Sequence, residues 1–166
     1  MKGQLTTLRR GALMSRIDAY RRIVRDFFIA FLLLLFFSSP VTAAERYAVT
    51  ANIANIRSGP GTNHAVLFEA EKYYPLNVLK KAGNWFQVED FEGDVGWIYK
   101  KLVEEVTTVI TKKSKCNIRT GPSLKNQVVF ISERGVPFLV LGKEGKWLHV
   151  RHSDGYEGWI HSSLVW

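Results

Sequence analysis

The feature that most constrains the fold of this chain is an internal repeat. When the 166 residues are shifted by 62 positions, the second half aligns with the first without a gap. Asn55–Arg57 falls on Asn117–Arg119, Gly96–Ile98 falls on Gly158–Ile160, and about 21 of the 55 aligned pairs are identical. Self-similarity at a fixed spacing indicates repeated copies of one structural unit. The sequence therefore predicts two copies of one small domain.

Each copy has the pattern of a β domain. The stretches "NWFQVED" and "KWLHVRH" alternate, which places Phe86 and Val88 on one face of a strand and Trp85 on the other. Glycines in "FEGDVGWIY" and "SDGYEGWIH" mark a turn that leads into a further strand. Short strands about ten residues apart, with turns between them, predict two small β-barrels, at 45–105 and 106–166. The joint, "EEVTTVIT", contains neither glycine nor proline, so limited relative freedom is expected.

Three elements of each copy carry a family resemblance. They are the motif N-I-R-[ST]-G-P, a tryptophan about 28 residues after its arginine, and G-W-I about 40 residues after it. This combination resembles the bacterial SH3-type domain, and most of all the subgroup found as tandem copies in exported proteins. The resemblance implies an all-β fold of two tandem SH3-like barrels. It also implies export and a non-catalytic role, often the binding of cell wall or peptides.

Residues 1–44 are predicted to be a signal peptide. An arginine-rich start is followed by the unbroken apolar run Phe27–Phe37 and by small residues that end at Ala43 or Ala44, the expected cleavage site. The apolar run of 11 residues is short of the roughly 20 that a membrane-spanning helix needs. An uncleaved anchor remains the alternative. The expected location is the periplasm or the external medium.

The inventory of reactive residues argues against catalysis. Cys116 aligns with Ala54 and is interpreted as a small buried residue rather than a nucleophile. His149 and His152 lie three apart in a predicted strand, so they point to opposite faces and do not form a metal site. The acidic residues of "VEDFEGD" are interpreted as a solvated turn. No catalytic residue, metal ligand or cofactor is predicted, and the chain is expected not to be an enzyme.

The glycine-rich stretch "NIRSGPGTNH" is predicted to form a turn rather than a phosphate-binding loop. Pro60 removes a backbone N–H from its middle, and no helical pattern follows it. Two roles stay open for Arg57 and its counterpart Arg119. The guanidinium either bonds carbonyls or an acid such as Asp90 or Asp154, or it anchors the carboxylate of a peptide or muropeptide.

Aromatic side chains are the second class of candidate ligand contacts. Because Trp85 lies opposite the predicted core face, one face of a barrel is expected to present rings to peptides or sugars. Tyr73 and Tyr74 align with Gly135 and Val136, so a better developed groove is expected in the first copy. The candidate ligand-binding residues are Arg57, Tyr73, Tyr74, Trp85, Trp97, Arg119, Trp147 and Trp159.

The formal net charge of +8 is unevenly distributed. Residues 1–44 carry a net charge of +5, which removes the main argument for a nucleic-acid partner. Residues 45–107 have seven basic and nine acidic side chains, whereas residues 108–166 have nine basic and four acidic ones. One hypothesis is that the lysine cluster at 112–115 binds an anionic polymer or membrane surface. The alternative is an ordinary solvated surface.

These observations predict a non-enzymatic, exported, monomeric binding protein. Its expected partner is peptidoglycan, a muropeptide or another envelope component such as a protein. The alternative is a peptide-binding or regulatory adaptor that has no glycan ligand. Membrane association is expected only through the N-terminal segment, if that segment is uncleaved.

Overall fold

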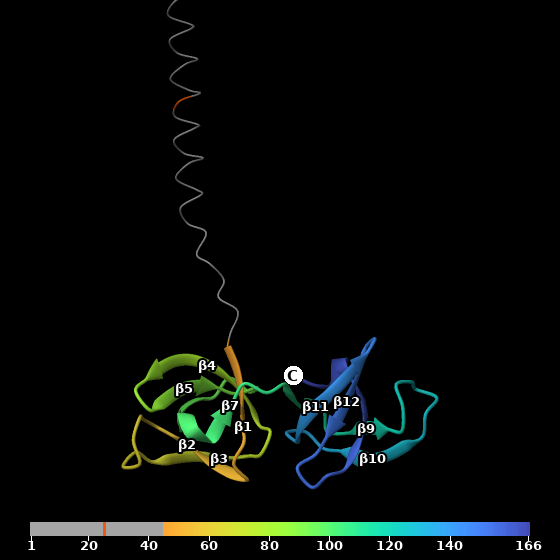
Figure 1. Cartoon of the computed structure of the whole chain (residues 1–166), viewed down its shortest axis with the longest axis horizontal. Coiled ribbons are helices and arrows are strands. Elements are labelled where there is room, and N and C mark those ends of the chain that lie inside the picture. Colours follow the sequence, from red (N-terminus) through yellow and green to blue (C-terminus); the bar gives the residue numbers. More distant parts are fainter. Residues whose placement is uncertain (1–24, 26–44) are drawn as a thin grey trace, which may run out of the picture. The chain divides into compact units, whose positions relative to one another are not determined.

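The computed structural model describes Arg25 and residues 45–166, so the predicted signal peptide, apart from Arg25, and its cleavage site at Ala43 or Ala44 lie outside the described residues. Among the residues that are described, no helix is long and apolar enough to cross a membrane. Residues 45–166 form two antiparallel sheets with two short 3₁₀ helices (Figure 1). This architecture confirms the all-β prediction and the tandem arrangement of two small domains.

The first copy is one sheet with the strand order β3-β2-β6-β5-β4-β1-β7. Its elements are β1 (Glu45–Val49), β2 (Ile53–Arg57), β3 (Val66–Glu71), β4 (Pro75–Ala82), β5 (Trp85–Glu89), β6 (Val95–Tyr99), η1 (Lys100–Leu102) and β7 (Val103–Glu104). The second copy has the order β10-β9-β13-β12-β11-β8. Its elements are β8 (Thr108–Ile110), β9 (Cys116–Arg119), β10 (Val128–Ser132), β11 (Pro137–Glu144), β12 (Trp147–Arg151), β13 (Glu157–His161) and η2 (Ser162–Leu164).

The repeat extends to strand register as well as to strand order. The pairing of Val49 with Val103 in the first copy recurs as an isolated bridge between Thr111 and Val165 in the second. In β4 the register shifts between Val78 and Lys80, and in β11 it shifts at the two aligned positions. A bulge bends a strand and increases its twist, so both sheets curl at the same point.

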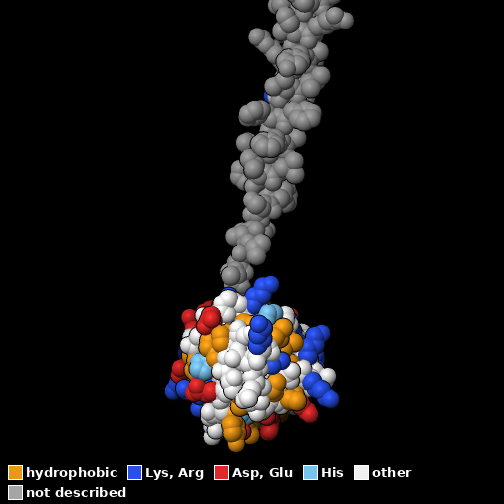
Figure 2. All heavy atoms as spheres, turned by 90° about the vertical axis from the view of Figure 1, so that its right-hand side faces the viewer, with side chains coloured by type: hydrophobic (Ala, Val, Ile, Leu, Met, Phe, Trp, Pro, Cys, Tyr) orange, Lys and Arg blue, Asp and Glu red, His pale blue; other side chains and the backbone are white. Residues whose placement is uncertain are grey.

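Alternation along the strands builds a core inside each copy. On β5, Phe86 and Val88 are 9% and 1% exposed, while Trp85 is only half-buried. This is the alternation that "NWFQVED" predicts. The fully buried Ile56, Leu76 and Ile98 complete the centre of the first core. The second core contains the aligned residues Ile118, Phe138, Val150 and Ile160. Figure 2 shows that other apolar side chains remain at the surface among charged and polar ones.

The two sequence motifs of each copy meet in the fold. Gly96 of β6 lies against β2, where an added Cβ would come within 2.3 Å of Ile56 Cγ2. At Gly158 an added Cβ would come within 2.5 Å of Ile118 Cγ2 and 2.9 Å of the Arg119 carbonyl oxygen. Only glycine allows this approach of the strands, which explains why N-I-R and G-W-I recur together.

One turn residue of the first copy has a costly backbone conformation. Tyr73 has φ of 72°, in the left-handed region, whereas the aligned position in the second copy is Gly135, with φ of 81°. Glycine adopts this region at no steric cost, but a residue with a Cβ does not. The first copy therefore bears backbone strain at a turn where the second copy does not.

Candidate functional site

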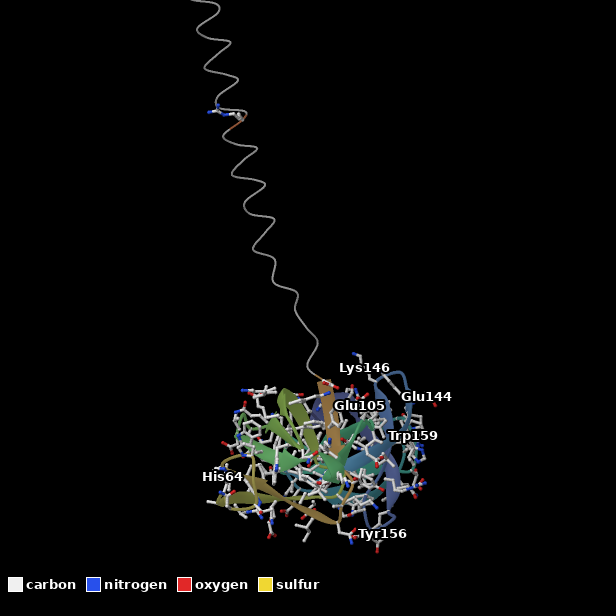
Figure 3. The ribbon with its side chains drawn as sticks, turned by 60° about the vertical axis from the view of Figure 1, so that its left-hand side comes forward. His64, Glu105, Glu144, Lys146, Tyr156 and Trp159 are labelled. Carbon is white, nitrogen blue, oxygen red and sulfur yellow. The ribbon has the colours of Figure 1, made fainter. Side chains whose placement is uncertain are left out.

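The loop between β2 and β3 is a closed turn held by Arg57. The Arg57 guanidinium donates through Nη1 to the carbonyl oxygens of Thr62 (3.2 Å) and His64 (2.8 Å). The His64 ring covers Gly59, where an added Cβ would lie 2.5 Å from Nδ1. Figure 3 labels His64 at this loop. His64 was not among the predicted site residues, because its counterpart in the second copy is Asn126.

The second copy repeats this clamp in a reduced form. The Arg119 guanidinium donates to the Asn126 carbonyl oxygen at 2.8 Å, and Asn126 lies over Gly121 as His64 lies over Gly59. Both arginines thus bond carbonyls of their own turn, one of the contacts expected from the sequence. Nη1 accounts for these bonds, and a guanidinium has five N–H donors, so each arginine retains donors for a further partner.

A groove of about 600 Å³ opens beside this clamp in the first copy. Arg57 and Asn55 of β2, Trp85 of β5 and Tyr99 of β6 line it, together with Ile53. Trp85 and Tyr99 are register partners on neighbouring strands, and their ring centroids lie 5.6 Å apart. The groove therefore combines two adjacent aromatic faces with an amide and a guanidinium, the composition that suits sugar rings and carboxylate-bearing peptides.

The groove contains only two of the aromatic or basic candidates from the first copy, Arg57 and Trp85. Trp97 lies on the half-buried face of β6, opposite Arg57 and Gln87 in register, and outside the groove lining. Tyr73 occupies the strained turn described above. Tyr74 is engaged in an internal hydrogen bond. Tyr73 and Tyr74 were expected to line the groove of the first copy, but neither is among its lining residues.

Sequence reasoning missed most of the lining residues, among them Ile53, Asn55 and Tyr99. Ile53 and Asn55 alternate along β2 with the buried Ala54 and Ile56, and Tyr99 follows Trp97 at a spacing of two. Those spacings place each residue on the outward face of its strand. The register of the β5–β6 hairpin, which brings Tyr99 beside Trp85, was not evident from alternation alone.

In the second copy two histidines pack against the tryptophans of the same face. The His149 and Trp159 rings stack at 5.0 Å with an interplanar angle of 17°, and the His161 ring meets Trp147 edge-on at 5.3 Å. Glu157 lies 3.3 Å from His149 Nε2 and holds that ring in place. Trp147 therefore contacts His161 as Trp85 contacts Tyr99, and Trp159 stacks on His149, where the first copy has Gln87.

The acidic turn of the first copy is not a uniformly solvated one. Asp90 is 6% exposed, and its carboxylate accepts hydrogen bonds from the backbone N–H groups of Glu92 (2.8 Å) and Asp94 (2.9 Å). It also accepts the Tyr74 hydroxyl at 3.0 Å. Burial, and then the charge of Asp90, raise the pKa of Tyr74 well above its usual range. The interpretation of "VEDFEGD" as a solvated turn is thus wrong for Asp90, which stabilises the turn from inside.

The reactive residues show no catalytic arrangement in the described part of the chain. Cys116 is fully buried, and burial raises the pKa of its thiol, which favours the unreactive protonated form. Within residues 45–166 no group of three His, Cys, Asp or Glu side chains could hold a metal ion.

Comparison with known proteins places this geometry in a family. The model of the bacterial SH3 domain matches residues 50–105 and again residues 112–166. A Bacillus subtilis (strain 168) protein, YrvJ, provisionally named an N-acetylmuramoyl-L-alanine amidase, is 26% identical over 159 residues. "Probable cell wall amidase LytH" of Staphylococcus epidermidis is 32% identical over 71 residues. These alignments cover 85% and 40% of this chain but only 30% and 24% of those relatives, so the chain spans under a third of their length.

Solved structures with some likeness include NlpC1 from Trichomonas vaginalis and an NlpC/P60 family protein from Bacillus cereus. NlpC1 is 18% identical with a TM-score of 0.35, over 77% of this chain and 47% of that one. The Bacillus cereus protein is 13% identical with a TM-score of 0.35, over 73% and 55% of the two chains. The two matches to the family model cover most of residues 45–166 and coincide with the two sheets. The chain belongs to the bacterial SH3 domain family, of which it carries two tandem copies.

Proposed function

We propose that this chain is an exported, non-enzymatic binding protein whose first SH3 domain recognises peptidoglycan. The groove beside Arg57, Trp85 and Tyr99 is the observation that carries the proposal, because it joins an aromatic surface to a guanidinium with unused donors. The names of the two amidase relatives support cell-wall material as the ligand class. Export is supported by the signal-like pattern of residues 1–44.

The groove offers a different contact to each part of a muropeptide. The faces of Trp85 and Tyr99 would pack against a sugar ring, whose axial C–H groups are apolar. The free guanidinium donors of Arg57 would bind a stem-peptide carboxylate, with a geometry that lysine does not reproduce. Asn55, on the same outward face of β2, would add an amide for hydroxyl or peptide groups.

Replacing Trp85 with alanine tests this proposal. Loss of the larger aromatic face is expected to weaken binding to purified peptidoglycan at least tenfold, since buried aromatic anchors carry about 2 kcal/mol or more of a binding energy. A sedimentation assay with insoluble peptidoglycan measures the change. Trp147→Ala is the matched control, because Trp147 is the aligned residue and has the equivalent ring contact with His161, but it does not line the groove.

The proposal fails if Trp85→Ala and Trp147→Ala bind as the wild-type protein does. A wild-type protein that binds stem peptides but ignores intact glycan would instead favour the adaptor function. Release of soluble fragments from peptidoglycan by the wild-type protein would instead indicate that the chain is a hydrolase.

The lysine cluster at the start of the second copy is proposed to add a salt-sensitive contact with anionic polymer. Lys113 and Lys115 are exposed, and Lys112 is half-buried. The triple substitution of these lysines by alanine is expected to weaken cell-wall binding at low salt and to leave binding at high salt unchanged, because salt screens exposed charges. If the triple variant binds cell wall at low salt as tightly as the wild-type protein does, the lysines do not make this contact. Figure 2 shows lysines and arginines interspersed with other side chains on the face it presents.

A further inference from the structure

The second copy has a surface that corresponds to the groove of the first. The strands that carry it have the same order in both copies. The turn after the arginine is also closed in the same way, by a backbone hydrogen bond from Ser58 to Ala65 in the first copy and from Thr120 to Gln127 in the second, each 2.9 Å long. The aligned residues therefore border one surface of the second copy, which we call the β9 face: Lys115, Asn117, Arg119, Lys125, Trp147 and His161.

The charge of the β9 face differs from that of the groove. Of the residues that line the groove, only Arg57 is charged. On the β9 face exposed lysines take the places of Ile53 and Asn63, and Arg119 is retained, so three residues are charged. Within residues 45–166, neither of these lysines nor Arg119 forms an ion pair with an acidic side chain. The face therefore has positive charge that the domain itself does not neutralise.

The acidic border of this surface is also reduced in the second copy. In the first copy Asn55 of β2 lies opposite Glu69 of the neighbouring strand. In the second copy Asn117 of β9 lies opposite Ile131. Glu133, at the position of Glu71, is the acid that remains on β10 or directly after it. The substitutions thus add two cations and remove one anion, and a negatively charged ligand complements the result.

The charged groups of the face follow a strand. Lys115 directly precedes β9, and Asn117 and Arg119 alternate within β9 with the buried Cys116 and Ile118. Because residues rise about 3.3 Å each along a strand, the two ends of this row are about 13 Å apart. A chain that carries repeated negative charges matches such a row better than a single small anion does.

Two rings give the face a place for a sugar. The His161 ring meets Trp147 edge-on at 5.3 Å, as Tyr99 lies beside Trp85 at 5.6 Å. The Ser163 N–H donates to His161 Nδ1 at 3.3 Å, so the neutral ring has its proton on Nε2. An N–H donor thus takes the place of the Tyr99 hydroxyl and suits a negatively charged oxygen. Trp147 is half-buried, so it offers a face to a sugar ring and is not free to insert into a bilayer.

We propose that the β9 face of the second SH3 domain binds an anionic glycan, a sugar chain with carboxylate or phosphate groups on successive units. Trp147 packs against one sugar ring, while Lys115 and Arg119 bind anionic groups on different units. Lys125 adds a third cation from the turn. This gives the second copy a site and a ligand class of its own, beyond the peptidoglycan site proposed for the first copy and the contact proposed for the lysines at 112–115.

The test is an NMR titration of the full chain at low salt, followed at the Trp147 indole N–H and the Arg119 backbone N–H. Tetragalacturonate carries a carboxylate on every ring, and maltotetraose phosphorylated at its 6-hydroxyl groups carries phosphates. Both are expected to give saturable shifts, and the tighter of the two identifies the anionic group. Unmodified maltotetraose has rings without charge and is expected to bind at least about tenfold more weakly. Acetyl-Glu-Glu-Glu-Glu-amide has charges without rings and is expected to bind at least about threefold more weakly.

Exchanges between the copies locate the binding. Lys115→Ile combined with Lys125→Asn gives the second copy the residues of the first and is expected to weaken binding of the charged oligosaccharides at least about tenfold. The matched control is Lys143→Ile combined with Lys146→Asn, which removes the same charge from two exposed residues of the same copy. Lys146 lies in the turn between β11 and β12 (Figure 3), and the counterparts of both control lysines lie outside the groove lining. The control is expected to change binding less than about twofold.

Substitution of the tryptophans separates this proposal from that for the first copy. Trp147→Ala is expected to weaken binding of the charged oligosaccharides at least about tenfold, because the ring face is lost. Trp85→Ala acts instead on binding of purified peptidoglycan by the first copy. Either proposal can therefore fail while the other holds.

The proposal is overturned if the charged oligosaccharides give no saturable shifts at Trp147, or if unmodified maltotetraose or the glutamate peptide binds as tightly as they do. It is also overturned if the variant that lacks Lys115 and Lys125, shown to be folded by its dispersed NMR spectrum, binds them as tightly as the control variant does. Sedimentation with phosphatidylglycerol vesicles without binding of the oligosaccharides would indicate a lipid surface as the partner and would likewise contradict it.

Discussion

Replacing Gly158 with alanine is expected to lower the free energy of unfolding of the second SH3 domain by about 3 kcal/mol, the upper part of the range for overpacked sites. The new Cβ would lie 2.5 Å from Ile118 Cγ2 and 2.9 Å from the Arg119 carbonyl oxygen. A side-chain methyl can move aside, but a backbone carbonyl fixed in a sheet cannot do so without loss of strand pairing. A domain of about 60 residues has roughly 3–9 kcal/mol of stability, so this loss is a large part of it.

Urea unfolding followed by tryptophan fluorescence measures the effect. Gly142→Ala is the matched control, because Gly142 lies in β11 of the same domain with open space around its Cα and no positive φ. Its substitution is expected to change stability by less than about 0.5 kcal/mol. Similar losses for the two variants would contradict the argument from close strand approach. Gly96→Ala is expected to act in the same way on the first domain.

Replacing Asp90 with alanine is expected to destabilise the first domain by at least about 3 kcal/mol. The variant loses the acceptor of two backbone N–H groups and of the Tyr74 hydroxyl at once. Hydrogen bonds to a charged group contribute about 1.5–3 kcal/mol each, and a buried hydroxyl left without a partner adds a penalty. Thermal or urea unfolding gives the magnitude.

The repeat supplies the control for this experiment also. His152→Ala removes the aligned side chain from the second domain, where it accepts one backbone N–H, that of Asp154, at 3.4 Å. A loss below about 1 kcal/mol is expected, because one long hydrogen bond is replaced by water. If the two substitutions lower the free energy of unfolding by the same amount, the hydrogen bonds of the buried Asp90 do not stabilise the acidic turn.

Much of the fold could be predicted from the sequence because each strand and turn pattern occurs in both copies, at aligned positions. Alternation in β5 and β12 correctly separated Phe86 and Val88 from Trp85, and the glycine-rich stretch after β2 is the predicted turn. The tandem SH3-like architecture followed from the spacing of three motifs. These signals are local, or recur at a fixed distance, and so can be read along the chain.

The candidate site was predicted less completely because it depends on strand register, which alternation along one strand does not specify. Arg57 and Trp85 lie at the groove, but Tyr99 joins them only through the register of β5 and β6. Tyr74 was predicted to contribute to the groove of the first copy. Its hydroxyl instead meets Asp90, 16 residues away, and that contact buries an acid which the local composition placed in solvent.

The replacement of Val49 by Thr111 bears on how two such similar copies fold in one chain. Tandem domains of related sequence can exchange equivalent strands and misassemble. The Thr111 hydroxyl donates to the Glu133 carbonyl and accepts the Val136 N–H at 3.0 Å, bonds that valine cannot make. In an exchanged pairing the hydroxyl of Thr111 would take the place of a Val49 methyl group in the apolar core of the first copy. One buried hydroxyl thus gives each copy a preference for its own strand.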